Sequence, residues 1–404
     1  FPARQAGYRL AAVKTVRAGM LPPAGEPCYI GTDPAATERL LQQWRPYQAG
    51  FYASGTAALA AAVSAALAVR PGRRRVLLPG YGCPALVSAV LHAGGKPMLV
   101  DLEPERPWMQ RAELHARLDG GVAAVVAVNF LGIPERLQEL AVAAEAAGAL
   151  LIEDSAQCFP PAGLAAGVAD CIVLSFGRGK PVSLLGGGAV LCRDPALAAA
   201  LPQPRPAGGR QRLRLKAAAY NLLRRPGLYW IPQLLPLGLG KTRFEPLAGI
   251  VALDESRRQA VGKAAADFLR QQPHGQRLVA QGPARVAGLT DVAAVCGGAS
   301  RLLRYPLLAP DAATRQELLV ALRQAGLGAS ALYEHVLPEV DAMPCAPLVH
   351  GELAQARDFA ARLLTLPVHS GVRPRHVRRM QQVIETVLAA SLPRWQGERK
   401  EKPG

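Results

Sequence analysis

Ser54, Gly55 and Thr56 come directly before the apolar stretch 57–63, and this pattern predicts the start of a helix. Small polar residues at a helix start leave backbone N–H groups and hydroxyls free to hold a phosphate. The same residues also suit an ordinary helix cap without any ligand. Alone, this motif predicts a helix N-terminus and leaves its function open.

Two acidic residues at the end of an apolar run form the second candidate motif. The apolar run 150–152 ends in Glu153 and Asp154, and the run has the composition of a buried strand. A carboxylate at the end of such a strand can anchor a cofactor, or it can cap the helix that follows. Both interpretations stay open at this point.

Lys180 lies in a glycine-rich loop that follows another apolar run, 171–175. A lysine in such a loop can bind phosphate, or it can be a desolvated amine suited to Schiff-base chemistry. The nucleotide-binding P-loop does not fit, because that pattern needs glycine in place of Leu174 and Ser or Thr in place of Pro181.

Taken together, the three motifs are more specific than each alone. Pyridoxal phosphate needs a lysine amine, a carboxylate for its ring nitrogen and a phosphate site. The chain supplies the phosphate site at 54–56, the carboxylate at Asp154 and the amine at Lys180. The combination predicts a pyridoxal 5'-phosphate enzyme.

Longer stretches around these residues carry a family likeness. They are SGTAAL (54–59), LPGY (78–81), AGGKPMLVD (93–101), NFLGIP (129–134), IEDSAQ (152–157), SF (175–176) with Lys180, and LPVH (366–369). In these motifs and their spacing, about residues 25 to 392 resemble the sugar aminotransferases of the DegT/DnrJ/EryC1/StrS group, which are fold-type I pyridoxal-phosphate enzymes. The likeness is specific to the family and does not name a substrate.

The resemblance implies a role for each matching residue. Lys180 would be the catalytic residue, binding the cofactor and then moving the substrate proton. Asp154 would pair with the pyridinium nitrogen, and Gln157 would lie against the ring. The residues expected to hold the phosphate are Gly55, Thr56 and Ser175.

The chain departs from the family pattern at several places. Cys83 stands where the family usually stacks an aromatic side chain on the cofactor, and Tyr81 is the nearby substitute, so both are expected at the cofactor. Asn129 replaces a common His, and Gly186 replaces an acidic residue. The related dehydratase branch has His in place of the lysine, so Lys180 favours transamination.

The substrate side is less specified. The family is dimeric, and a segment of the partner completes each site; about residues 200 to 245 are hard to align with it, and Asn221 is the candidate there. Tyr333 and His335 fall where relatives shape the sugar site, although a surface or interface histidine is the alternative for His335. His369 is expected to be structural. No metal site is expected.

Short apolar runs alternate with Ala-rich stretches between 45 and 192, as in a mostly parallel α/β sheet covered on both faces. The predicted strands are 76–79, 97–101, 122–128, 150–154, 171–175 and 188–192, with helices at 84–93 and 134–147. Helices at 247–272, 312–325 and 375–392, with short strands within 302–308, predict a smaller α+β domain. The predicted domains are therefore 1–245 (with an excursion at 195–244), 246–395 and a tail, 396–404.

Charge is the unusual feature of the composition. The 404 residues include 47 Lys+Arg and 30 Asp+Glu, which leaves a net charge of +17. Nine of the basic residues and no acidic residue lie within 195–244. The part 205–231 mixes Arg with Leu and aromatic residues, which suits an anionic membrane surface, the approach of a nucleotide diphosphate, or a solvated arm. Nucleic acid is not expected, because no recognised binding motif accompanies the charge.

Seven scattered cysteines without a CxxC pair indicate free thiols in a reducing compartment. No apolar run is long enough to span a membrane. We therefore expect a cytoplasmic homodimer, and peripheral membrane contact through 205–231 stays open. Its expected reaction moves an amino group from an amino acid, with glutamate as the expected donor, to a nucleotide-linked keto sugar. The product would serve polysaccharide, glycolipid or glycosylated-metabolite synthesis. The alternatives are a sugar dehydratase or lyase on the same fold, or a non-catalytic binding protein at a membrane.

Overall fold

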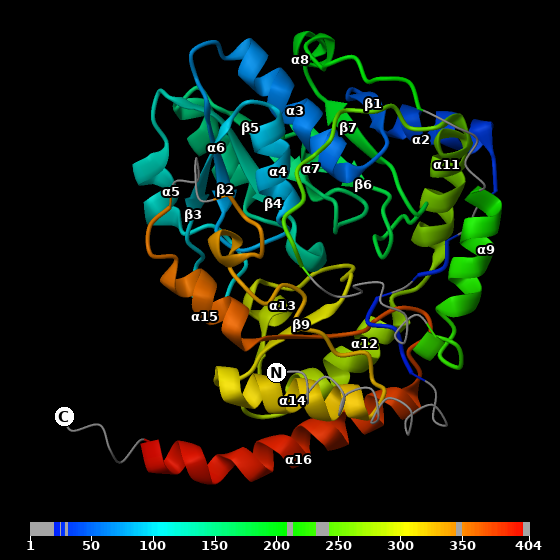
Figure 1. Ribbon diagram of the computed structural model, residues 1–404, viewed down its shortest axis with the longest axis vertical. Helices are drawn as coiled ribbons and strands as arrows, with labels where there is room; N and C mark the ends of the chain where they lie inside the picture. The colour runs from blue at the N-terminus through cyan, green and yellow to red at the C-terminus, as the bar shows by residue number, and fades with distance from the viewer. Residues whose placement is uncertain are drawn as a thin grey trace.

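The computed structural model describes residues 20–24, 26–28, 31–207, 213–231, 242–344 and 350–398, with side chains to residue 391. Cys345, parts of the basic excursion and residues 399–404 of the predicted tail lie outside the described residues. The chain forms a large sheet with helices on both faces, beside a smaller sheet with its own helices (Figure 1).

The large sheet has seven strands in the order β1-β7-β6-β5-β4-β2-β3. The strands are β1 (Gln48–Tyr52), β2 (Arg75–Pro79), β3 (Lys96–Val100), β4 (Val122–Val128), β5 (Leu150–Asp154), β6 (Cys171–Ser175) and β7 (Gly188–Cys192). Neighbours from β3 to β6 are parallel, and β7 runs antiparallel to both β6 and β1. This confirms the predicted mostly parallel sheet and its six predicted strands.

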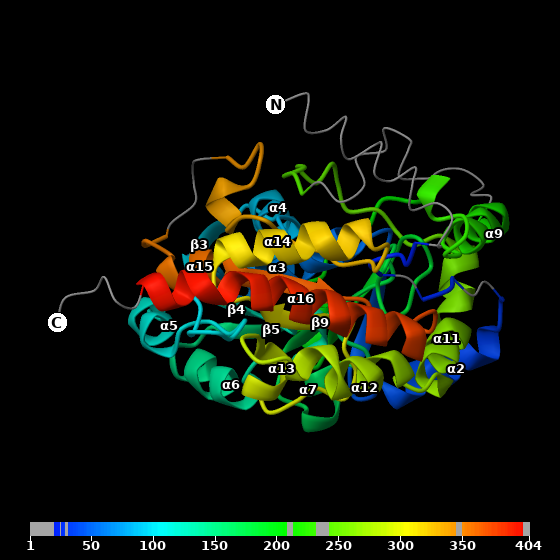
Figure 2. The same ribbon diagram turned by 90° about the horizontal axis from the view of Figure 1, so that it is seen from below.

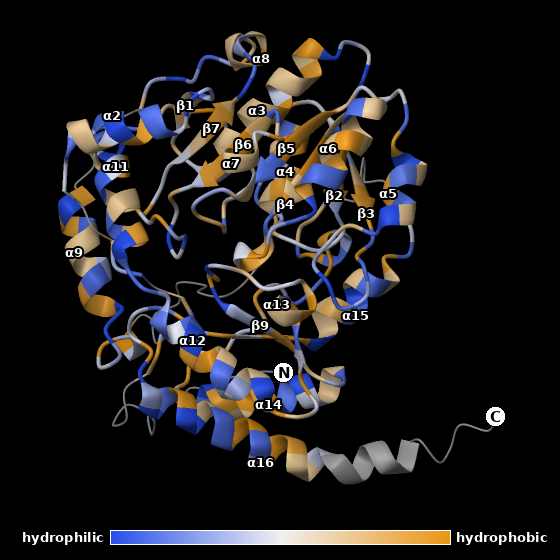
Figure 3. Ribbon diagram, turned by 180° about the vertical axis from the view of Figure 1, so that it is seen from behind, coloured by the Kyte–Doolittle hydropathy of each residue, from blue (hydrophilic) through white to orange (hydrophobic). Residues whose placement is uncertain are grey.

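Both faces of this sheet are buried, as nearly continuous apolar strands require. Neighbouring strand residues such as Leu151 and Ile152 belong to separate apolar clusters, one on each face. Figure 3 shows the strands as the most hydrophobic part of the fold. The helices around the sheet are α2 (Pro34–Gln43), α3 (Gly55–Val69), α4 (Ala85–His92), α5 (Arg111–Arg117), η1 (Phe130–Gly132), α6 (Leu137–Ala146), α7 (Ala162–Ala166), α8 (Pro195–Ala199), α9 (Leu213–Leu223) and α11 (Glu255–Arg270).

The smaller sheet is antiparallel, in the order β10-β9-β8. Its elements are β8 (Thr290–Asp291), β9 (Tyr305–Leu308), β10 (Leu363–Leu366), α12 (His274–Gln281), η2 (Pro283–Arg285), α13 (Val292–Val295), α14 (Ala312–Gln324), η3 (Leu337–Glu339), α15 (Ala354–Arg362) and α16 (Pro374–Glu398). Helices α14 and α16 run side by side beneath it (Figures 1 and 2). The large-sheet part and the small-sheet part are joined at Asp101, which follows β3. Its carboxylate accepts hydrogen bonds from the backbone N–H groups of Gln355 (3.0 Å) and Ala356 (2.7 Å) at the start of α15.

The predicted helix 247–272 starts later than expected. Residues 251 and 252 pair as isolated bridges with Arg205 and Tyr52, and Asp254 then caps α11 by accepting a hydrogen bond from the N–H of Arg257 (3.1 Å). The apolar face of α11 joins the core of the large sheet, and the helix packs against α2. In space, α11 therefore packs with the large sheet, although it follows the predicted boundary at residue 245.

The crossing of α2 and α11 requires glycine at residue 262. An added Cβ there would lie 2.2 Å from the carbonyl carbon of Ala36. We expect Gly262→Ala to lower the free energy of unfolding by about 1–3 kcal/mol, because the two helices must separate. Urea unfolding measures this, with Gly120→Ala as the control, since nothing lies within 4 Å of an added Cβ at Gly120. Equal midpoints for the two variants would contradict the prediction.

None of the helices in the described ranges combines the length and apolar character needed to cross a bilayer.

Candidate active site

A cavity of about 190 Å³ opens at the carboxyl ends of the parallel strands. Ligand sites of α/β sheets are usually found at this edge. Its walls come from the start of α3, the loop after β2, the ends of β4, β5 and β6, and the glycine loop before β7. The lining residues are 54–56, Leu59, Gly82, Cys83, Ala85, Leu86, Val128, Phe130, Asp154, Ala156, Gln157, Ser175, Gly177, Lys180, Gly186 and Gly187. The structure thus brings together Gly55, Thr56, Cys83, Asp154, Gln157, Ser175 and Lys180 from the sequence analysis.

The N-terminus of α3 forms one end of this cavity. The Ser54 hydroxyl caps the helix by accepting a hydrogen bond from the N–H of Ala57 (3.1 Å). A helix start leaves its first backbone N–H groups without intrahelical acceptors, and the helix dipole favours an anion there. Gly55 allows Ser175 to approach, because an added Cβ would lie 2.6 Å from the Cβ of Ser175. The arrangement provides the hydroxyls and N–H groups that a phosphate needs.

Asp154 ends β5 and is almost fully buried, at 9% exposure. Its Oδ1 accepts a hydrogen bond from the N–H of Ala156 (2.9 Å). Burial raises the pKa of the Asp154 carboxyl, while the Ala156 hydrogen bond and the charge of Lys180 oppose the rise. Within the described part of the chain no hydrogen bond reaches Oδ2, so this oxygen can accept one from a ring N–H.

Lys180 lies in the loop between β6 and β7 and lines the cavity together with Asp154. The loop is tight because the N–H groups of Leu184 and Gly186 both donate to the carbonyl of Phe176 (2.8 and 3.1 Å). The amine, the open carboxylate oxygen and the helix N-terminus therefore face one space. These are the three groups that pyridoxal phosphate requires, so the residues present fit this cofactor.

Gln157 connects the cavity wall with Tyr333. Its Oε1 accepts a hydrogen bond from the N–H of Leu131 (2.8 Å), and its Nε2 donates to the hydroxyl of Tyr333 (3.1 Å). Burial raises the pKa of the Tyr333 hydroxyl, and the neighbouring Cys83 adds to the rise. Tyr333, predicted as a substrate residue, therefore lies immediately behind Gln157 and Cys83.

Tyr81 does not occupy the place predicted for it. The described lining of the cavity includes Cys83 but not Tyr81, which is 2% exposed. Its ring packs against Phe130, Tyr333 and Phe359 at centroid distances of 5.5–5.8 Å, and its hydroxyl donates to the carbonyl of Tyr333 (2.9 Å). Apolar packing between the two domains thus takes the ring away from the cofactor cavity and leaves Cys83 there.

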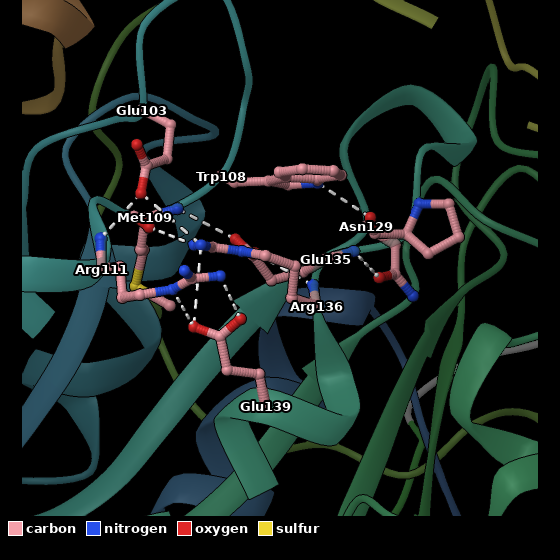
Figure 4. A network of polar contacts seen from close by, with 9 residues as sticks. Glu103, Trp108, Met109, Arg111, Asn129, Glu135, Arg136 and Glu139 are labelled. Atoms are coloured by element: carbon pink, nitrogen blue, oxygen red, sulfur yellow. Dashed lines mark hydrogen bonds and ion pairs between the residues drawn. The ribbon is translucent and has the colours of Figure 1, made fainter. Parts of the chain in front are cut away.

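Asn129, which replaces a common His, lies outside the cavity lining and is fully buried. Its Nδ2 donates to Glu153 Oε1 (2.6 Å) and Ser155 Oγ (2.8 Å), and its Oδ1 accepts from the N–H of Glu135 (3.0 Å). Figure 4 shows Asn129 beside Glu135, within a network that continues through Arg136 to Glu103 and Glu139. Asn129 therefore fixes the ends of β4 and β5, which carry the cavity.

Two other candidate residues lie elsewhere. His335 is exposed and lines neither of the cavities described here. Asn221, on α9, binds the backbone of Cys28 in the same chain, with its Nδ2 donating to the Cys28 carbonyl (2.7 Å) and its Oδ1 accepting from the Cys28 N–H (2.8 Å). Its amide is therefore engaged within the subunit.

A second, smaller cavity of about 40 Å³ adjoins the first and shares Lys180 and Gln157 with it. Its lining brings Glu26 from the N-terminal segment together with Phe268, Arg301 and His369. The sequence analysis did not find Glu26 or Arg301, because neither belongs to a motif and they are far apart in the chain. His369 was expected to be structural.

His369 is held in its neutral form. Its Nε2 donates to the carbonyl of Pro22 (2.9 Å), and its Nδ1 accepts from the N–H of Gly371 (3.1 Å). The pKa of His369 is lowered to about 4, chiefly by burial and also by the charges of the neighbouring Arg224 and Arg304.

This histidine should make stability depend on pH. The unfolded chain takes up the proton near pH 6.5 but the folded chain only near pH 4, so the stabilisation is complete above pH 6.5 and is lost as the pH falls toward 4. The loss should reach about 3 kcal/mol. Urea unfolding at pH 7.5 and 4.5 should show a smaller pH effect in His369→Gln, whereas the exposed control His335→Gln should behave as wild type. Equal pH effects in wild type and His369→Gln would contradict this.

Known proteins resemble this chain in sequence and in fold. The chain is 34% identical over 169 residues to protein MosB of Rhizobium meliloti, but this match spans only 40% of the chain and 32% of MosB. It is 27% identical over 340 residues to the UDP-N-acetyl-3-dehydro-alpha-D-glucosamine 3-aminotransferase of Acidithiobacillus ferrooxidans, over 83% of each protein. It superposes on Helicobacter pylori PseC, an aminotransferase involved in the biosynthesis of pseudoaminic acid, with a TM-score of 0.68 and 15% identity, covering 95% of this chain and 96% of PseC.

The structural match confirms the predicted fold, and the family match covers the cofactor cavity. The model of the DegT/DnrJ/EryC1/StrS aminotransferase family matches residues 48–222, which include the α3 N-terminus, Asp154 and Lys180. Residues 48–222 therefore match the DegT/DnrJ/EryC1/StrS aminotransferase family, which is the resemblance that the sequence motifs indicated.

Proposed function

We propose that this protein is a pyridoxal-phosphate-dependent aminotransferase that moves an amino group from glutamate to a keto sugar carried on a nucleotide. One observation carries the proposal: Lys180, Asp154 and the N-terminus of α3 line a single cavity. The relative from Acidithiobacillus ferrooxidans, whose name gives a UDP-linked 3-dehydro sugar, supports this class of acceptor. The pathway proposed for the product is surface polysaccharide, glycolipid or glycosylated-metabolite synthesis.

The residues of the cavity divide the chemistry among them. Bound pyridoxal phosphate supplies an electron sink that weakens the C–H bond next to the amine. Lys180 Nζ holds the cofactor and then acts as base and acid for the substrate proton. The open Oδ2 of Asp154 keeps the ring nitrogen protonated. The hydroxyls of Thr56 and Ser175 and the first N–H groups of α3 bind the phosphate.

The two half-reactions test this function. Glutamate should convert the purified holoenzyme from the pyridoxal to the pyridoxamine form, seen as loss of the visible absorbance of the bound cofactor. UDP-N-acetyl-3-dehydro-α-D-glucosamine, or another nucleotide-linked keto sugar from a panel, should restore it. A sugar that is consumed without any conversion by glutamate or other amino acids would instead favour a dehydratase or lyase.

The assembly and location follow as parts of the same proposal. We propose a cytoplasmic homodimer, and equilibrium sedimentation tests the dimer directly.

We also propose that helix α9 contacts an anionic membrane surface, because Leu215 (63% exposed) and Leu222 (48%) lie among basic residues. Flotation with anionic vesicles should be reduced in Leu215→Ser/Leu222→Ser and unchanged in the control Val142→Ser, whose residue is equally exposed (61%). Equal flotation of both variants would reject α9 as the contact.

A further inference from the structure

The smaller cavity beside Lys180 contains a guanidinium held in place by an aromatic ring. The guanidinium carbon of Arg301 lies 3.8 Å from the centroid of the Phe268 ring, and the side chain is half-buried. Within the described ranges this side chain makes no hydrogen bond and no ion pair within 4 Å. A guanidinium has five N–H donors in a fixed plane, so Arg301 presents an unused, oriented set of donors to the cavity.

Glu26 lines the same cavity, and one of its two carboxylate oxygens is without a partner among the described residues. Glu26 Oε1 accepts a hydrogen bond from the N–H of Ser370 (3.1 Å), whereas Oε2 is buried and has no hydrogen-bond partner among the described residues. The charges of Glu26 and Arg301 influence each other, but the two groups do not form an ion pair. Buried polar atoms are nearly always hydrogen-bonded, so an unpartnered oxygen on a residue that lines a cavity suggests that a ligand supplies its partner.

The geometry points to a sugar subsite: we propose that Arg301 and Glu26 together bind a hydroxyl group of the sugar moiety of the acceptor, next to Lys180. This inference rests on the proposed aminotransferase function for the identity of the ligand. The ligand must both accept and donate a hydrogen bond here, because Arg301 can only donate hydrogen bonds and an ionised Glu26 can only accept them. A hydroxyl satisfies both at once, since it accepts from the guanidinium and donates to the carboxylate.

The alternatives fit less well. A carboxylate of the amino donor or a phosphate would accept from Arg301 but has no proton to give Glu26, and it would bring a second anion beside an existing one. The small volume also suits a part of a sugar rather than a nucleoside diphosphate. The pair should therefore act on sugar affinity and leave the donor half-reaction nearly unchanged.

Equilibrium binding to the holoenzyme tests the subsite without turnover. The probes are UDP-N-acetyl-α-D-glucosamine and dTDP-α-D-glucose, each compared with its nucleoside diphosphate by calorimetry. Arg301→Gln and Glu26→Gln should each weaken binding of the sugar nucleotides about tenfold or more, because a charged hydrogen bond is lost. Neither should change binding of UDP or dTDP or the rate of conversion by glutamate by more than about twofold. Arg258→Gln is the matched control, because its guanidinium also lies over a ring, that of Phe51 (5.9 Å), outside the cavity.

Each contrary outcome has a separate meaning. Equal weakening of sugar nucleotides and free diphosphates overturns the sugar subsite in favour of a phosphate site. Slower conversion by glutamate with unchanged sugar binding overturns it in favour of a donor carboxylate site. Unchanged binding in both variants, or no sugar-nucleotide binding by wild type, also rejects it. If the variants behave as expected but glutamate converts nothing, the sugar subsite stands and the proposed aminotransferase function fails.

Discussion

Lys180→Ala should abolish covalent attachment of the cofactor and lower turnover by at least about 10⁴-fold, because one amine serves both as the attachment point and as the acid and base for the substrate proton. Lys180 lines both adjoining cavities, so this residue lies between the cofactor space and the proposed substrate space. Borohydride reduction followed by peptide mapping measures the attachment, and the two half-reactions measure the catalysis.

Lys263→Ala serves as the control for this prediction. Lys263 pairs with Asp267 at 3.1 Å on α11 and lines neither cavity. It should retain the label and the activity of wild type. Recovery of a cofactor-labelled peptide without residue 180 would reject the assignment, even if Lys180→Ala were inactive.

Asp154→Asn should keep the cofactor bound but slow transamination by about 10²–10³-fold, because the substituted amide cannot carry the charge that keeps the ring nitrogen protonated. The side chain keeps its size, so packing at the end of β5 should be unchanged. Stopped-flow measurement of the glutamate half-reaction gives the rate. The exposed carboxylate of Asp119 provides the control, since Asp119→Asn changes the net charge by the same amount.

Stability separates a catalytic defect from an unfolding defect in this variant. Burial raises the pKa of the Asp154 carboxyl, so the ionised form is disfavoured in the folded protein, and its contribution to stability is lost as the pH rises through this pKa. Without cofactor, Asp154→Asn should therefore be at least as stable as wild type at pH 7. A variant that is less stable, or one that keeps the wild-type rate, would contradict the role given to this carboxylate.

Two features show how far local sequence patterns could predict this molecule. The runs that became β2 to β7 are short, apolar and separated by turn residues or helical stretches, and each forms the expected strand. The helix at 247–272 was misplaced at its start because nothing local shows that residues 251 and 252 pair with Arg205 and Tyr52. Such pairing depends on segments about 50 and 200 residues away.

In the candidate site, too, some features follow from local sequence and others only from long-range packing. Asp154 and Lys180 could be selected from the sequence because each ends or follows a strand, and parallel strands deliver their carboxyl ends to one edge. Tyr81 and Cys83 are two residues apart, and only the packing of Tyr81 against Phe359 of the small domain decided which of them faces the cavity.

The sequence by itself determined the mostly parallel sheet, the family resemblance and the order of the proposed cofactor groups, because these depend on local periodicity and on short motifs at strand and helix ends. The tertiary structure alone decided the placement of α11 with the large domain and the meeting of Glu26 with Arg301 beside Lys180. The physical reason is that burial and close contact between distant segments are properties of the packed chain. A carboxylate without a partner exists only once the fold has removed it from water.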